Sequence, residues 1–195
     1  DPAQTAFMSH RIREAEGRGE TLTIRYEWVP LDAISRHLRR AVIVAEDARF
    51  YEHRGIDWHA LREELRYSGD AVFRWTDPAD LQALVDAVRY YRENRDAVRG
   101  RSTITQQLAK NLYLSPERSL VRKAEEFIIA RRLERFLTKD RILELYLNTA
   151  EWGPGIFGAE AAAREYFGRS AASLSRDQAA ALAATLPHPL TSNPA

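Results

Sequence analysis

The chain has 195 residues, a formal net charge of +1 at pH 7, an apolar fraction of 45% and no cysteine. This length suffices for one well-packed domain, the near-zero charge argues against a dedicated nucleic-acid binder, and the lack of cysteine excludes disulfides and thiolate metal sites. No apolar run approaches the roughly 18 residues of a membrane span, and the first ten residues lack a signal-peptide pattern. We therefore expect a soluble globular chain.

The N-terminal part predicts one strand and one helix. Residues 21–30 alternate apolar and polar side chains, as a half-buried strand does. A helix is expected over about 33–50, because apolar residues recur there at helical spacing. That stripe consists of Ile34, Leu38, Ala41 and Ala45.

Residues 62–99 are rich in arginine and predict one clear helix. Asp77 is its expected N-cap and Pro78 its first residue. Before it, a loop carries Phe73 and Trp75. One face of the helix gathers the apolar residues Leu81, Leu84, Val85, Val88 and Tyr91.

The C-terminal half predicts mostly helices. They are expected over 102–114, from Ser115 and Pro116 onward, over 138–148 up to a Gly-Pro-Gly turn, over 159–167, and after a capping box of Ser175 with Gln178. The predicted fold class is therefore mainly α with one small β element, as a single domain over 1–195 that contains 62–99 as an extended segment.

Glu46 stands out in the stretch "AVIVAEDARFYEH", residues 41–53. On a continuous helix its neighbours one turn away are Val42, Ile43 and Phe50. Partial desolvation favours the neutral form of a carboxyl group, as a general base working near neutral pH requires. The alternative is a carboxylate at the edge of the core that pairs with a nearby arginine.

Glu126 lies in a similar setting in "RKAEEFIIARRLE". It shares a helical stripe with Arg122, Ile129 and Leu133. The main apolar face is expected to consist of Leu120, Ala124, Phe127 and Ile128. Two partly buried glutamates on separate helices suit acid–base chemistry on sugars, although a surface helix with ion pairs is the alternative.

The stretch "GRSTITQQLAKN", residues 100–111, is unusually polar. Its hydroxyl and amide side chains could bind a polyhydroxylated ligand, or form an ordinary helical N-terminus; they are Ser102, Thr103, Gln106 and Gln107. A basic cluster follows that could hold a pyrophosphate or be a solvated face: Lys110, Arg118, Arg122 and Lys123. The histidines lack H-E-x-x-H spacing, so no metal site is expected.

Together these stretches resemble the peptidoglycan glycosyltransferases, most closely their monofunctional biosynthetic form. Five family motifs occur in order over residues 46–189: "EDARFYEHRG", "GRSTITQQ" followed by "LAKN", "RKAEE", "KDRILELYLN" with "GIFGAEAAAREYFG", and "LAATLPHP". The resemblance covers nearly the whole chain.

The resemblance implies a lysozyme-like bilobal helical fold with a long cleft. Glu46 is then the general base, and Glu126 assists on the donor side. The motifs also supply the expected substrate-binding residues, which are Asp47, Phe50, His53, Ser102, Thr103, Gln106, Gln107, Lys110, Asn111, Arg118, Arg122 and Lys123. The reaction implied is glycan polymerisation from lipid II, with inversion to β-1,4 bonds and release of undecaprenyl pyrophosphate.

The resemblance also implies partners and a location. The expected partners are lipid II, the growing glycan strand, a membrane surface and transpeptidases of the cell-wall machinery, but no nucleic acid. No cofactor is expected, while a divalent cation is left open. An anchor is expected before Asp1, with the domain on the outer face of the bacterial cytoplasmic membrane.

The chain departs from the family between its first two motifs, where 62–99 is longer than usual. We expect this segment to cover the acceptor side or to contact the bilayer through Phe73 and Trp75; a simple surface excursion is the alternative. Two other functions are weighed against synthesis. A glycan-cleaving enzyme needs no pyrophosphate cluster, and a non-enzymatic basic-surface binder is expected to bind nucleic acid with strong salt dependence.

Overall fold

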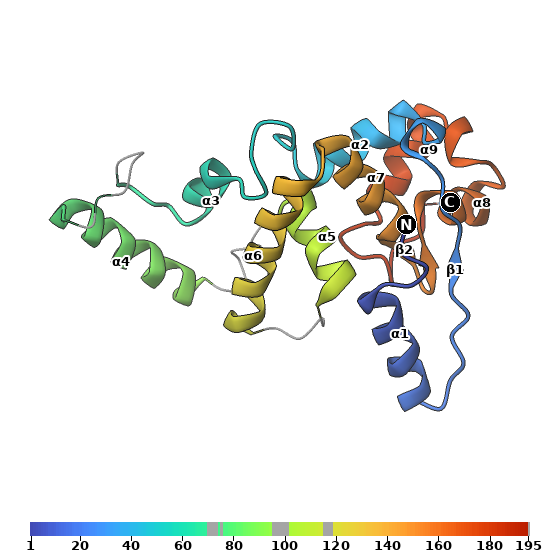
Figure 1. The fold of residues 1–195 in the computed structure, drawn as a ribbon, viewed down its shortest axis with the longest axis horizontal. Coiled ribbons are helices and arrows are strands. Elements are labelled where there is room, and N and C mark those ends of the chain that lie inside the picture. The colour runs from blue at the N-terminus through green and yellow to red at the C-terminus, as the bar shows by residue number, and fades with distance from the viewer. Residues whose placement is uncertain (70–73, 75, 95–101, 115–118, 195) are drawn as a thin grey trace. The chain divides into compact units, whose positions relative to one another are not determined.

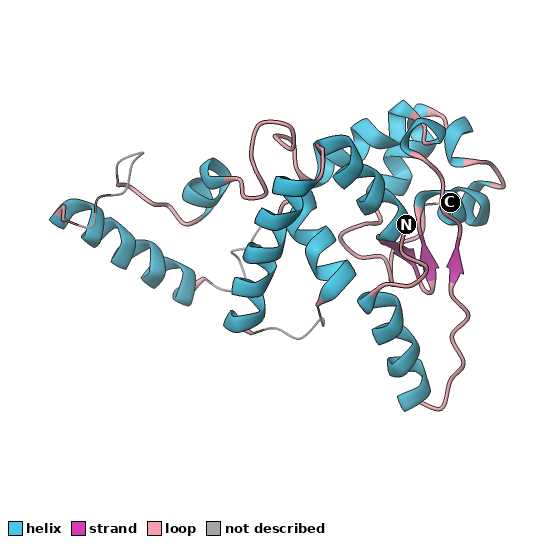
Figure 2. Ribbon diagram, in the orientation of Figure 1, coloured by secondary structure: helices cyan, strands magenta, loops and turns pink. Residues whose placement is uncertain are grey.

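The computed structural model describes residues 1–69, 74, 76–94, 102–114 and 119–194 (Figure 1). Within these ranges the chain is mainly helical with one small sheet, which confirms the predicted fold class (Figure 2). The elements are α1 (Ala6–Gly17), β1 (Arg25–Tyr26), η1 (Leu31–Ala33), α2 (Arg36–Glu46), α3 (Trp58–Glu64), α4 (Pro78–Glu93), α5 (Ile104–Tyr113), α6 (Leu120–Phe136), α7 (Lys139–Thr149), β2 (Glu151–Gly153), β3 (Ile156–Phe157), α8 (Ala159–Phe167), η2 (Ala171–Ser173) and α9 (Arg176–Ala183). None of the helices in the described ranges combines the length and apolarity needed to span a bilayer.

The chain divides into two compact units. The first combines Asp1–Ile56 with Ser102–Ala195, and the second is Asp57–Arg101. In the first unit α5 packs against α6, α7 and α1, while α2 packs against α9. The core of this unit is built around α7 and the sheet. Its largest fully buried side chains include Tyr146 and Leu147 of α7 and Trp152 and Phe157 of the sheet.

The sheet has the order β1-β3-β2, with β1 parallel and β2 antiparallel to β3. Only two residues of the predicted strand 21–30 pair, but the predicted alternation holds along its length: Leu22, Ile24, Tyr26 and Trp28 are half-buried, whereas Thr21, Thr23, Arg25 and Glu27 are exposed. Gly158 connects β3 to α8 with φ +87°. A Cβ there would lie 2.9 Å from the carbonyl oxygen of Asn148, so only glycine fits.

The predicted helix over 33–50 is too long. The helix α2 ends at Glu46, so Phe50 does not follow Glu46 along a helix; it is fully buried in the core from the turn after α2. Ala45, expected on the buried stripe, is exposed, while Leu38 and Val42 are buried. The helix ends here because the carboxylate of Asp47 turns away to accept a hydrogen bond from the backbone N–H of Ile104 at 3.0 Å.

The predicted apolar face of α6 is wrong. Ile128 is 57% exposed and Ala124 is exposed, whereas Glu126 is only 2% exposed. The buried face is the stripe of Glu126, Ala130 and Leu133. This face can be buried because the Glu126 carboxylate forms ion pairs with cations of α6 and a hydrogen bond with Ser102. These interactions compensate the desolvation of its charge. The helix is capped by Ser119, and the predicted start at 115–116 lies outside the described residues.

The second unit contains α3, which was not expected, and α4, which was. Asp77 caps α4 by accepting a hydrogen bond from the N–H of Ala79, as predicted. The buried carboxylate of Asp80 accepts hydrogen bonds from the Tyr67 hydroxyl at 3.3 Å and the Arg74 N–H at 2.9 Å. Four residues of the predicted apolar face of α4 are exposed, at 39% for Leu81, 37% for Leu84, 50% for Val85 and 51% for Val88, and the side chain of Tyr91 is not described. Phe73 and Trp75 lie outside the described residues.

Candidate active site

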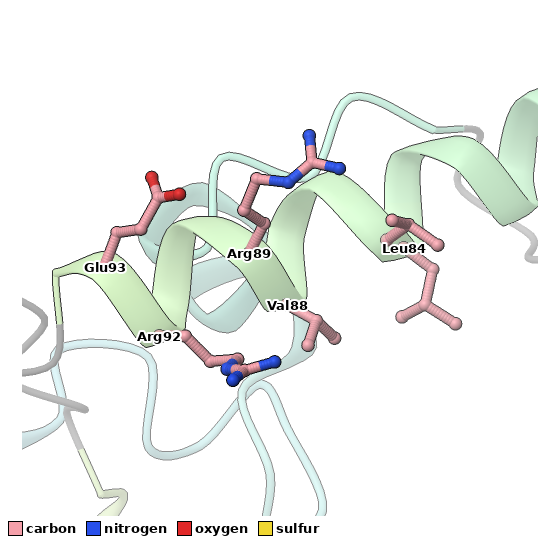
Figure 3. Close-up of a pocket in the computed structure, with 6 residues that line it drawn as sticks. Leu84, Val88, Arg89, Arg92 and Glu93 are labelled. Atoms are coloured by element: carbon pink, nitrogen blue, oxygen red, sulfur yellow. The ribbon is translucent and has the colours of Figure 1, made fainter.

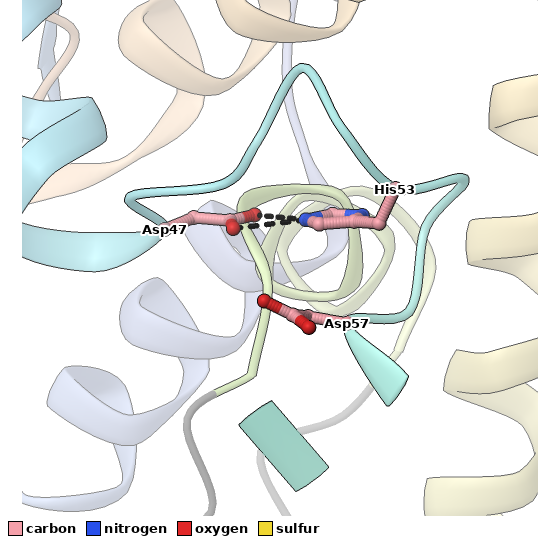
Figure 4. A group of neighbouring side chains, drawn as sticks. All are labelled: Asp47, His53 and Asp57. Atoms are coloured by element: carbon pink, nitrogen blue, oxygen red, sulfur yellow. Dashed lines mark hydrogen bonds and ion pairs between the residues drawn. The ribbon is translucent and has the colours of Figure 1, made fainter. Parts of the chain in front are cut away.

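The loop after α2 is attached to the start of α5. The Nε2 atom of His53 lies 2.9 and 3.0 Å from the two carboxylate oxygens of Asp47, and the two side chains face each other in Figure 4. Asp47 also accepts the N–H of Ile104. Asp47 is 7% exposed, and its hydrogen bonds connect the residues after Glu46 to the α5 N-terminus. The role of these hydrogen bonds in the fold is therefore to position Glu46.

A second link joins the same two segments. Thr103 and Gln106 form a capping box at the α5 N-terminus, and the Thr103 hydroxyl donates to the carbonyl oxygen of Gly55 at 2.6 Å. Gly55 has φ +89°, and a Cβ there would approach the Ala130 carbonyl oxygen at 3.3 Å, so α6 also requires this glycine.

Six of the predicted substrate-binding residues are thus engaged inside the fold. Phe50 is fully buried, with the ammonium group of Lys139 at 4.3 Å from its ring centre. The others are buried or pair with a buried carboxylate, which leaves little of their side chains for a ligand; they are Asp47, His53, Thr103, Gln106 and Asn111. These residues therefore contribute to packing and positioning, and the direct substrate contact expected from the motifs stays a prediction.

Glu46 is half-buried at the C-terminal end of α2. Its Oε2 atom accepts a hydrogen bond from Nε2 of Gln107 at 2.7 Å. The same amide nitrogen donates to the backbone carbonyl of Ser102 at 3.2 Å, and Oε1 of Gln107 accepts from the Tyr146 hydroxyl at 2.9 Å. The carboxylate of Glu46 is therefore held by α5, which is in turn held by α7.

Glu126 is surrounded by cations. Its carboxylate accepts from Nη1 of Arg122 at 2.9 Å and from Nζ of Lys123 at 2.5 Å. The Ser102 hydroxyl accepts from Nζ of Lys123 at 2.9 Å and lies 3.5 Å from Glu126. One negative charge therefore meets two positive ones, so the cluster keeps a net positive charge.

Lys110 adds a third cation from α5. Burial lowers the pKa of its ammonium group below the ordinary value; Arg122 and Lys123 act in the same direction, while Glu126 and Glu46 oppose them. An anion bound beside Lys110 would stabilise this charge. In the described residues, the buried Nε of Arg122 has no hydrogen-bond partner. Arg118, also predicted for this cluster, lies outside the described residues.

Tyr146 is the residue of the site that the sequence did not reveal. In "KDRILELYLN" it follows the apolar pattern of a core helix, and it is 1% exposed. No local signal distinguishes it from the buried leucines around it. Only the packing of α7 against α5 brings its hydroxyl to Gln107.

A pocket of a different character lies on α4 in the second unit. It is lined by Leu84, Val85, Val88, Arg89, Arg92 and Glu93. Figure 3 shows Leu84, Val88 and Arg92 along one side of the helix. This surface joins apolar side chains to guanidinium groups and carries none of the predicted catalytic residues.

Comparisons with known proteins identify the family of the chain. The Transglycosylase family profile matches residues 16–67 and 60–195. The chain is 46% identical over 189 residues to the biosynthetic peptidoglycan transglycosylase of Bordetella pertussis, covering 97% of this chain and 70% of that protein. Proteins of the same name from Bordetella avium and Thiobacillus denitrificans are 47% and 45% identical, again over 97% of this chain and over 71% and 72% of theirs.

Proposed function

The chain belongs to the Transglycosylase family and is a peptidoglycan glycosyltransferase, and we propose from the geometry of its site how it polymerises glycan chains. The proposed substrates are lipid II and the growing glycan strand. The proposed reaction forms a β-1,4 bond with inversion at the donor carbon and releases undecaprenyl pyrophosphate.

Glu46 is the proposed general base. The 4-hydroxyl oxygen of the acceptor sugar attacks the anomeric carbon of the donor, and its proton passes to the Glu46 carboxylate. As the new C–O bond forms, the bond from the anomeric carbon to the pyrophosphate oxygen breaks, and its electron pair leaves with the pyrophosphate. Attack from the side opposite the leaving group inverts the configuration.

The cations near Glu126 are proposed to receive the leaving group. Negative charge develops on the pyrophosphate in the transition state, and Lys110, Arg122 and Lys123 supply donors already held in place. Glu126 fixes Arg122 and Lys123 by direct ion pairs, so its proposed role is to position donors on the pyrophosphate side.

One observation supports this proposal most. Ser102 contacts both parts of the site: its backbone carbonyl accepts from the amide that holds Glu46, and its hydroxyl is bonded to Lys123. The base and the cationic cluster thus belong to one hydrogen-bond network. A hydroxyl nucleophile and a pyrophosphate leaving group can be bound at its two ends, as one displacement requires.

The proposed reaction places the protein at the cell envelope, and we propose the outer face of the cytoplasmic membrane, where the lipid-linked substrate resides. The exposed face of α4 is the proposed contact with the bilayer, because Leu84 and Val88 suit its apolar boundary and Arg89 and Arg92 suit anionic headgroups. Transpeptidases that cross-link the strands are proposed partners.

The test is polymerisation of labelled lipid II in detergent by the wild-type chain and by Glu46→Gln. We expect long glycan chains from the wild type and a rate reduced roughly 10²- to 10⁴-fold in the variant, the usual contribution of a general base. Glu52→Gln is the matched control, because Glu52 is an exposed glutamate six residues along the chain. It should keep the wild-type rate.

The outcomes separate the alternatives. Equal rates for wild type and Glu46→Gln would remove Glu46 as the base but leave the reaction standing. Release of soluble fragments from purified cell wall, with no polymer from lipid II, would overturn synthesis in favour of cleavage.

A further inference from the structure

Both the nitrogen and the oxygen of the Gln107 side-chain amide form hydrogen bonds, with two other side chains and one backbone carbonyl. Its nitrogen donates to Oε2 of Glu46 at 2.7 Å and to the Ser102 carbonyl at 3.2 Å, and its oxygen accepts from the Tyr146 hydroxyl at 2.9 Å. The three side chains come from α2, α5 and α7, so the arrangement exists only in the folded unit.

The Tyr146 hydroxyl decides which form of Glu46 this amide prefers. Burial raises the pKa of Tyr146 well above its ordinary value, and the nearby carboxylates of Glu46 and Asp47 act in the same direction, so the phenol keeps its proton. That proton needs an acceptor, which is Oε1 of Gln107. The amide nitrogen is therefore turned to Glu46. A donor at this position favours the ionised carboxylate, whose oxygens only accept hydrogen bonds, because a protonated carboxyl group would also need an acceptor for its own proton.

We propose that Tyr146 is a positioning residue, which acts through Gln107 to hold Oε2 of Glu46 and to leave Oε1 for the proton of the attacking hydroxyl. The proposal rests on the proposed role of Glu46 as base. Among the described residues, Oε1 of Glu46 has no hydrogen-bond partner, as this division between the two oxygens requires.

Several charged or titratable groups face Glu46 from the packed elements. Lys110 on α5 is near enough for the Glu46 carboxylate to act on the pKa of its ammonium group, and Asp47 is the next residue in the chain. Asp47 is itself paired with His53, and Arg122, Lys123 and Glu126 of α6 interact electrostatically with Lys110. Replacing Tyr146 by phenylalanine changes none of these charges, so an altered titration of Glu46 would report the hydrogen-bond chain alone.

The experiment measures the rate of polymer formation from labelled lipid II between about pH 5 and 9 for wild type, Tyr146→Phe and Gln107→Met. Without the phenol, Gln107 is free to reverse and accept a proton from neutral Glu46. The acidic limb of the rate profile should therefore move to higher pH by about half a unit or more, roughly a threefold change in proton affinity. The two changes combined should shift it no further than Gln107→Met alone, since they act in one chain.

Tyr166→Phe is the matched control. Its hydroxyl donates to the Trp152 carbonyl at 3.2 Å in the same unit, so this variant also loses one tyrosine hydrogen bond. It should lower thermal stability without moving the acidic limb. The proposal is overturned if Tyr146→Phe leaves the acidic limb unmoved and lowers the rate equally at every pH. Glu46→Gln, measured in the same series, separates the two proposals, because full activity in that variant removes the base and with it the need for positioning.

Discussion

The helices α6 and α4 have nearly equal lengths, 17 and 16 residues, and each buries a carboxylate on its inner face. On α6 the stripe of Glu126, Ala130 and Leu133 is inside, and Ile128 is 57% exposed. On α4 the small residues Ala83 and Ala87 are buried, and the larger apolar side chains lie outside. The spacing of apolar residues therefore predicts that a helix forms but not which of its faces is buried.

The reason for the difference is the partners available to each face. The Glu126 carboxylate meets Arg122 and Lys123, so its desolvation is compensated by ion pairs and hydrogen bonds. On α4 the Asp80 carboxylate is buried because Tyr67 and the N–H of Arg74 donate to it. In both helices the inner face includes a buried carboxylate that has donors, and several larger apolar side chains lie on the surface.

The largest expected effect tests the two faces of α6. Leu133→Ala removes a side chain that is 9% exposed and should lower the free energy of unfolding by about 2–5 kcal/mol. Ile128→Ala, five residues earlier on the exposed face, should stay within about 0.5 kcal/mol of wild type. Urea unfolding followed by circular dichroism measures both. Similar losses in the two variants would mean that the apolar face of α6 is covered after all.

The next effect concerns the cations of the site. Lys110→Gln should lower kcat/KM for polymerisation by about a hundredfold, because a donor to the pyrophosphate is lost. The pKa of Lys110 is lowered in the folded chain, so its charge is less favourable there than in the unfolded chain, and the variant should unfold at the same temperature or higher near pH 7. Steady-state kinetics and thermal unfolding give the two numbers.

The control for this variant is Arg132→Gln, which removes an exposed cation of α6 six residues beyond Glu126, on another face of the helix. It should change neither number appreciably. If Lys110→Gln unfolds at a much lower temperature, its loss of activity is structural, and Lys110 has no special part in leaving-group binding.

The smallest expected effect concerns the apolar face of α4. Leu84→Ser with Val88→Ser should reduce sedimentation with vesicles of mixed phosphatidylglycerol and phosphatidylcholine by about tenfold, because two apolar side chains no longer enter the interface. Stability should change little, since both residues are exposed. Val44→Ser, an exposed valine on α2, is the control and should leave vesicle binding unaltered. Equal binding by the double variant and wild type would remove α4 as the membrane contact.

Features that depend on neighbours along the chain could be predicted from the residues alone. The cap at Asp77 and the capping box of Ser175 with Gln178 were predictable, because each requires residues only two or three positions apart. The motifs also predicted Glu46, Gln107, Lys110 and Glu126 as members of one site, since their order matches the family that the comparisons confirm.

The hydrogen bonds and burial of these residues depend on contacts between distant parts of the chain. Asp47 bonds Ile104, 57 positions later in the chain, which ends α2 and removes Phe50 from the helix predicted for it. Tyr146 reaches Gln107 across 39 positions. Periodicity records which residues share a face of one helix, whereas burial and hydrogen bonding depend on which second element packs against that face.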